Sequence, residues 1–194
     1  MSSRAIPVTG AQPRPSGWWG MLLLIATEAT LFGVLIASYF YLRFKSPDWP
    51  QGAIAEPKLL KPLVYTLILL FTSIPMQVAF ASARAARRSF VVANLTAALL
   101  IGGLYLWLQS ELLLENAQSF TPRTNAYGSI YYTLTVGHAA HVFAGLLLNL
   151  WLIARVSRRL TVYRENGIHA AALYWHAVNV LAVAVTITVL SPSL

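Results

Sequence analysis

A single carboxylate lies in the middle of a long apolar run. Between Gly17 and Leu42 the chain reads GWWGMLLLIATEATLFGVLIASYFYL, and Glu28 is its only acidic or basic residue. The run can cross a bilayer, which takes about 20 helical residues. An ionised carboxylate at mid-membrane costs about 2.5–3.5 kcal/mol on insertion scales. A proton, a polar partner or a water-filled cavity must offset that cost, so a proton-active role and a structural hydrogen bond both stay open.

Two histidines at helical spacing lie in another apolar run, YGSIYYTLTVGHAAHVFAGLLLNLWLIA. His138 and His141 are three residues apart, so a helix presents them on neighbouring positions of one face. The residues around them are small, which lets a second helix approach closely. We expect both histidines to face the interior and to form interhelical hydrogen bonds. A metal-dependent enzyme using Glu28, His138 and His141 is a lesser alternative. The two histidines give only two ligands, zinc usually takes three or four, and the carboxylate could add a third. We predict no metal site.

Counting residues along the two helices predicts a contact. Glu28 lies 15 residues from Arg43, and His141 lies 14 residues from Tyr127. At 1.5 Å per residue these positions are about 22 Å and 21 Å from the same side of the membrane. Glu28 and His141 should therefore meet at one depth, with His138 about one turn nearer the outside.

The composition is that of an integral membrane protein. Of 194 residues, 57% are hydrophobic and 10% are charged, whereas a soluble domain carries about 25% charged residues. The net charge of +8 comes from short basic clusters between apolar runs, which is typical of membrane-flanking charge and gives no reason to expect nucleic acid. The absence of cysteine excludes thiolate metal sites, c-type haem attachment and disulfides.

The apolar runs predict an all-α polytopic membrane protein with five transmembrane helices. We expect these spans at residues 17–43, 60–83, 90–113, 129–154 and 171–190, with a kink at Pro75 in the second. The domain organisation is a polar cytoplasmic segment, 1–16, followed by one transmembrane domain, 17–194.

Charge asymmetry predicts the orientation. Nine Lys or Arg residues fall on the side of the N-terminus, and five on the opposite side. The richer side is cytoplasmic by the positive-inside rule, so the N-terminus is expected inside and the C-terminus outside. Among the inner arginines, Arg155, Arg158 and Arg159 follow the fourth span, where basic pockets bind lipid headgroups.

We predict no catalytic residues and no redox cofactor in this chain. His138 and His141 are too close together to serve two haem layers, and no activated nucleophile or nucleotide loop is evident. An independent proton-linked carrier or channel using Glu28 and His141 remains an alternative. The lack of an internal repeat argues mildly against it.

Three motifs resemble subunit III of haem–copper terminal oxidases, the cytochrome c oxidase subunit III family. The first is the helix around Thr27-Glu28, ending in the aromatic pair Tyr39-Phe40. The second is similar to the family's YGS…GxHxxHVxxG helix, carried here by Tyr127, Gly128, Ser129, Gly137, His138, His141, Val142 and Gly145. The third is similar to the final AAxYWHxVD motif, carried by Tyr174, Trp175 and His176.

The resemblance implies an accessory, cofactor-free subunit of a proton-pumping oxidase in the bacterial inner membrane. Its direct partner would be subunit I, with subunit II and other small subunits in the complex, and haem and copper would reside in those partners. It would support proton uptake and stability of subunit I and bind structural phospholipid, with Arg155 near a family arginine that contacts lipid phosphate. The electron donor, cytochrome c or quinol, stays open, as does an accessory role in a nitric oxide reductase.

The chain departs from the family pattern in the last helix. Asn179 replaces the usual acid after YWHxV, and His169 replaces a frequent Glu before AAA. The resemblance covers the last five of the seven helices of the long family form.

Overall fold

The computed structural model describes residues 16–52 and 54–193, and their regular structure is entirely helical. The helices are α1 (Ser16–Lys45), α2 (Leu60–Leu70), α3 (Ser73–Arg84), α4 (Arg88–Ala117), α5 (Ala126–Arg158) and α6 (Val162–Leu190), followed by a short 3₁₀ turn, η1 (Ser191–Ser193). Within these residues, five helical segments are long and apolar enough to cross a membrane, with α2 and α3 together forming one of them. The predicted all-α architecture with five spans is confirmed.

Helix α6 begins earlier than the sequence predicts. The expected span started at residue 171, but the helix starts at Val162. Thr161 caps it, because its hydroxyl accepts a hydrogen bond from the backbone N–H of Arg164 at 3.4 Å. Hydropathy locates only the apolar part of a helix, so this polar first turn was missed.

The second span is broken near Pro75. Proline lacks an N–H, so it cannot bond the carbonyl four residues earlier, that of Phe71. That carbonyl instead accepts from Ile74 at 3.3 Å, and α2 ends at Leu70 before α3 begins at Ser73. Within the interruption, the Thr72 hydroxyl donates a hydrogen bond to the carbonyl of Leu69 at 2.6 Å. The predicted kink is therefore present as a short interruption between two helices.

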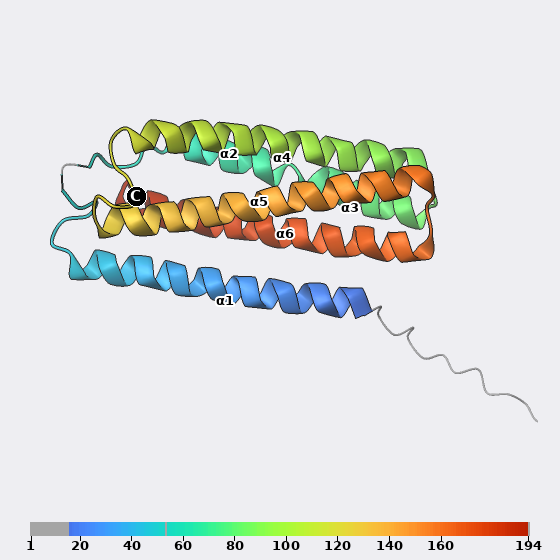
Figure 1. Cartoon of the computed structure of the whole chain (residues 1–194), viewed down its shortest axis with the longest axis horizontal. Helices are drawn as coiled ribbons and strands as arrows, with labels where there is room; N and C mark the ends of the chain where they lie inside the picture. The colour runs from blue at the N-terminus through green and yellow to red at the C-terminus, as the bar shows by residue number, and fades with distance from the viewer. Residues whose placement is uncertain (1–15, 53, 194) are drawn as a thin grey trace, which may run out of the picture.

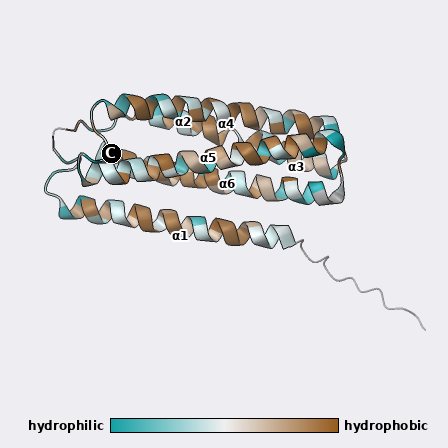
Figure 2. Ribbon diagram, in the orientation of Figure 1, coloured by the Kyte–Doolittle hydropathy of each residue, from teal (hydrophilic) through white to brown (hydrophobic). Residues whose placement is uncertain are grey.

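The helices lie side by side in an elongated bundle, with α1 at one edge (Figure 1). Helix α6 is central, since it contacts α1, α2, α3 and α5, whereas the main contacts of α1 within the described residues are with α5 and α6. Hydrophobic residues cover the long sides of the bundle, and hydrophilic residues gather towards its two ends (Figure 2). This distribution is the one expected of a bundle immersed in lipid.

Trp175 of α6 forms the centre of the main core. Its side chain is fully buried, and its ring fits against Gly102 of α4 and Gly145 of α5. A Cβ atom at either glycine would come within 3.0 Å of the ring. The indole N–H donates to Oδ1 of Asn149 at 3.1 Å. The two glycines therefore make the space that the tryptophan fills.

Candidate functional site

Glu28 and His141 form a hydrogen bond between α1 and α5. Oε2 of Glu28 lies 2.8 Å from Nε2 of His141, as the depth count predicted. The other ring nitrogen, Nδ1, lies 2.7 Å from the carbonyl oxygen of Gly137, one turn earlier on α5. The imidazole is thus held at both nitrogens, and its ring is fixed in direction.

This geometry determines how many protons the pair holds. The Gly137 carbonyl has no proton to give, so Nδ1 of His141 must carry one and donate it. The short contact between Nε2 and the carboxyl of Glu28 then needs one further proton, on either atom. A neutral acid bonded to a neutral imidazole and a carboxylate bonded to an imidazolium both have zero net charge. The pair therefore avoids the cost of an isolated charge in the membrane.

An apolar groove of about 250 Å³ opens beside the pair. Its walls come from α1 and α6 and include Leu24, Ile25 and Leu181. The side chains of Glu28 and His141 are 26% and 21% exposed, so the pair borders the groove and is not sealed in the core. The remaining groove walls are largely apolar, so the zero net charge of the pair suits its surroundings.

Tyr174 and Phe32 hold His141 from two further directions. The Tyr174 hydroxyl donates to the backbone carbonyl of His141 at 2.8 Å. The rings of Phe32 and His141 meet edge to face, with centroids 5.2 Å apart. All three motifs thus meet at His141. It belongs to the second motif, in α5, and contacts Glu28 of the first, in α1, and Tyr174 of the third, in α6.

His138 does not join this pair. Its side chain is 2% exposed and points to α4, where its ring lies 6.0 Å from that of Tyr105. Within the part of the chain that the structure describes, neither ring nitrogen of His138 has a hydrogen-bond partner. Among residues 16–52 and 54–193, no three His, Cys, Asp or Glu side chains gather as metal ligands would, so the alternative metal set of Glu28, His138 and His141 is not assembled. A helix spacing of three places the two histidines on adjacent positions, yet they face different neighbouring helices.

His176 and Asn179 connect α6 to the break between α2 and α3. The amide of Asn179 donates to Ser73 Oγ at 2.7 Å and to Thr72 Oγ1 at 3.1 Å. Since Ser73 Oγ accepts this bond, its own proton is available for Nδ1 of His176 at 3.2 Å. Nε2 of His176 then carries the ring proton and faces Oε1 of Gln77 at 3.4 Å. Asn179 thereby donates hydrogen bonds to both hydroxyls. An ionised acid at that position could not do so, because a carboxylate has no proton to donate.

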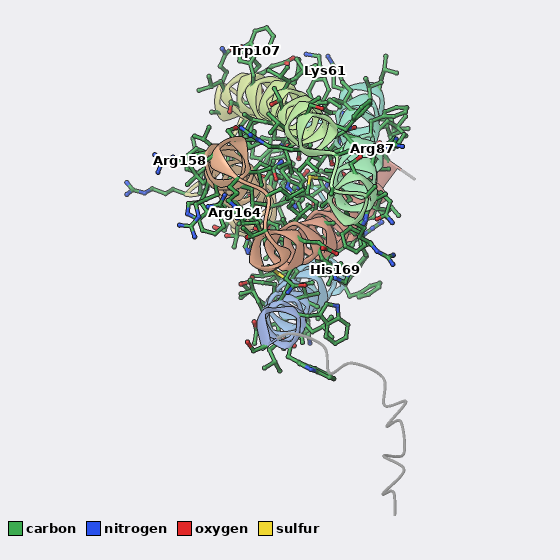
Figure 3. All side chains as sticks on the ribbon, turned by 90° about the vertical axis from the view of Figure 1, so that its right-hand side faces the viewer. Lys61, Arg87, Trp107, Arg158, Arg164 and His169 are labelled. Carbon is green, nitrogen blue, oxygen red and sulfur yellow. The ribbon has the colours of Figure 1, made fainter. Side chains whose placement is uncertain are left out.

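The three arginines of the predicted lipid site do not line one cavity together. Arg155 stacks on Trp151, with the guanidinium carbon 5.1 Å from the ring centroid, and borders a cavity of about 190 Å³ together with Arg164. Arg158 and Arg159 do not line that cavity, and Arg158 extends away from the bundle (Figure 3). Arg164 was missed as a site residue because it lies in the turn before the last apolar run.

Replacing Glu28 with glutamine is expected to leave the bundle assembled. The amide N–H of glutamine can donate to Nε2 of His141, so one hydrogen bond and zero net charge are both preserved. We expect the free energy of unfolding in mild detergent to fall by less than about 1 kcal/mol. Glu28→Leu is the matched comparison, since it removes the bond, and equal losses in the two variants would contradict this reasoning.

Comparison with known proteins gives a consistent family. The model for "Cytochrome c oxidase subunit III" matches residues 15–191. Cytochrome c oxidase subunit 3 of Thermostichus vulcanus is 31% identical over 171 residues, covering 84% of this chain and 80% of the relative. The Synechocystis subunit is 32% identical, covering 88% and 73%. Cytochrome bo(3) ubiquinol oxidase subunit 3 of Pseudomonas aeruginosa is 31% identical, covering 86% and 80%.

Proposed function

Because this chain belongs to the cytochrome c oxidase subunit III family, we propose that it lies against subunit I of a proton-pumping haem–copper oxidase and stabilises it. The chain is an accessory subunit, a component of an oxidoreductase complex. Oxygen reduction would take place in partner subunits, which would carry the haem and copper.

The observation that carries this proposal is the bond between Glu28 and His141. It joins the two most distinctive motifs of the chain at 2.8 Å. Both nitrogens of His141 are engaged, by Glu28 and by the carbonyl of Gly137, so the pair is complete without a metal ion. A pair with zero net charge and both imidazole nitrogens bonded suits a subunit that supports a neighbour's chemistry.

In this proposal the partner subunits determine which electron donor the complex uses. The relatives are named as subunits of both cytochrome c oxidases and a ubiquinol oxidase, at similar identity. We propose that subunit II or its equivalent selects cytochrome c or quinol, and that this chain serves either type.

We propose that the complex lies in the bacterial inner membrane with the arginine-rich end of the bundle in the cytoplasm. That end contains Arg87, Arg158 and Arg164, which Figure 3 shows together with His169. His169 stacks on Phe80 there, with ring centroids 4.3 Å apart. The positive-inside rule then places the C-terminus outside.

The cavity beside Arg155 is proposed as a phospholipid headgroup site. Two cations, Arg155 and Arg164, meet there with the apolar side chain of Leu152 and the ring of Trp151. Arginine suits phosphate because its planar fork donates two parallel hydrogen bonds. Of the predicted set, Arg155 lines this cavity, whereas Arg158 and Arg159 do not.

Substituting both cavity arginines is expected to release bound phospholipid. In the Arg155→Gln/Arg164→Gln variant, phospholipid retained after detergent purification should fall by about one molecule per chain. Arg158→Gln serves as the control, because it removes the same charge outside the cavity. Lipid phosphorus assays on the purified complexes measure the difference, and an equal loss in the control variant would refute the site.

The proposed function is tested by removing this subunit from a purified oxidase. The depleted enzyme should keep its haem spectrum and its initial oxygen consumption, yet lose activity faster during turnover, and adding the subunit back should restore its lifetime. Loss of haem or of initial activity on depletion would contradict an accessory role. Proton flux by the isolated chain in liposomes, abolished by Glu28→Gln, would instead favour an independent carrier.

A further inference from the structure

Helices α4 and α5 carry a row of polar side chains where they pack together. Spacings of three, four and seven residues keep each helix's members on one side. This row, called the seam below, consists of the half-buried Asn116 and the buried residues Gln109 and Tyr105 on α4, and Tyr131, Thr135 and His138 on α5.

Two contacts set the register of this seam. Near one end, the amide of Asn116 donates to the hydroxyl of Tyr131 at 2.6 Å. Deeper in the bundle, the rings of Tyr105 and His138 meet with centroids 6.0 Å apart. Since the helices are antiparallel, Gln109 falls between these contacts, at the level of Thr135. Polar side chains therefore recur at three levels between the end of the bundle and His138.

The shallow end of the seam opens to a cavity of about 340 Å³. Asn116 and Tyr131 line this cavity. The charged residues Glu56, Lys58, Lys61 and Glu115 also line it, at the end of the bundle opposite the arginine-rich end. Polar walls and this volume suit water. The first pair of the seam, Asn116 and Tyr131, would then contact solvent.

The deep end of the seam has unmet hydrogen-bonding capacity. Both ring nitrogens of His138 are buried without a partner. Each such orphan costs about 1–3 kcal/mol unless a ligand satisfies it, and buried polar groups of this kind commonly bind internal water. Thr135 donates its hydroxyl proton to the carbonyl of Tyr131 at 2.8 Å, so its oxygen can still accept a bond from water. The amide of Gln109 offers both donors and acceptors.

We propose that water occupies this seam and forms a proton-conducting file from the outer cavity to His138 and on to the Glu28–His141 pair. Water bridges of this kind are nearly as favourable as direct hydrogen bonds. His138 accepts a proton at one ring nitrogen and releases the proton of the other, so no net charge accumulates on the ring. The final transfer passes through water around α5, because His138 faces α4 whereas His141 faces α1. Both nitrogens of His141 are already bonded, so the arriving proton goes to a carboxyl oxygen of Glu28, and the proton that the pair shared leaves by the same route.

Beyond Tyr131 and the charged residues of the outer cavity, ionisable groups face this route at the pair and at His138. At the pair these are Glu28 from α1 and Tyr174 from α6, whose hydroxyl is engaged by the carbonyl of His141. At His138 the facing group is Tyr105 from α4. The inference does not require an oxidase partner, so it can fail while the proposed function holds.

Hydrogen–deuterium exchange at the pair tests the file. In the purified complex in lipid nanodiscs, infrared spectroscopy follows the exchangeable band of the pair after transfer to D₂O. The band belongs to the Glu28 carboxyl or to the His141 imidazolium, whichever holds the shared proton, and Glu28→Gln identifies it. We expect His138→Phe and Gln109→Leu each to slow exchange at least about tenfold, the scale at which losing a positioned proton relay is felt.

Ser110→Ala is the matched control. Ser110 follows Gln109 on α4 but is exposed on the other face and bonds the carbonyl of Leu106 at 2.7 Å, so its loss should leave the rate unchanged. Wild-type exchange rates in both seam variants would overturn the proposal and leave the row as interhelical hydrogen bonding alone. A pair that does not exchange at all in the wild-type protein would overturn it equally. Gln109→Leu keeps the test valid if His138→Phe fails to assemble.

Discussion

Replacing Trp175 with alanine is expected to lower the free energy of unfolding by about 3–5 kcal/mol, the range for truncating a buried large aromatic residue. The side chain is fully buried and fills the space that Gly102 and Gly145 leave open. Glycine has no side chain that can move into the resulting cavity. The substitution also deprives Asn149 of its bond at 3.1 Å, although its Nδ2 already lacks a partner.

Unfolding in mild detergent with increasing denaturing detergent measures this effect. Trp107→Ala is the matched control, because Trp107 is 62% exposed on α4 and should contribute within about 0.5 kcal/mol. Trp175→Phe should fall between the two, since it retains most ring contacts and loses only the indole bond. Similar losses at Trp175 and Trp107 would show that the core is not organised around the indole.

Removing one partner of the membrane pair is expected to have the second largest effect. His141→Leu deprives the Glu28 carboxyl of its partner and breaks the bond to the Gly137 carbonyl, at an expected cost of about 1–3 kcal/mol. The double variant Glu28→Leu/His141→Leu should cost less than the sum of the two single variants. Two apolar side chains leave no unpaired group beside the apolar groove.

A double-mutant cycle on the unfolding free energies checks this expectation. A coupling energy of about 0.5–3 kcal/mol supports a real interaction across α1 and α5. Additive losses would mean that the bond contributes nothing, whatever its length in the structure. Val34→Leu is a control on α1, because Val34 is 60% exposed and belongs to neither partner's surroundings.

The contact between Glu28 and His141 was predictable from the sequence because depth in a membrane is a simple coordinate. Two helices that cross the same bilayer in opposite directions rise 1.5 Å per residue. Counting from Arg43 and Tyr127 therefore placed both side chains at the same level. The five spans were predictable for a similar reason, since long apolar runs with few charges leave little alternative.

Other features depend on how each helix is rotated relative to its neighbours, which sequence spacing does not determine. His138 and His141 were expected to act on one surface, but a three-residue step turned one towards α4 and the other towards α1. Tyr105 carried no signal of its own, because aromatic residues are common in membrane helices. Arg164 precedes the apolar part of α6 and was therefore assigned to a loop.

The most direct test of the central claim is to purify this chain from native membranes in mild detergent and record what accompanies it. The proposed accessory role predicts a stable complex containing a haem–copper subunit I, with the haem spectrum and the metals assigned to the partner. The same complex should form when Glu28→Gln replaces the native subunit. Isolation of the chain without any haem-containing partner, or haem and copper bound by this chain itself, would contradict it.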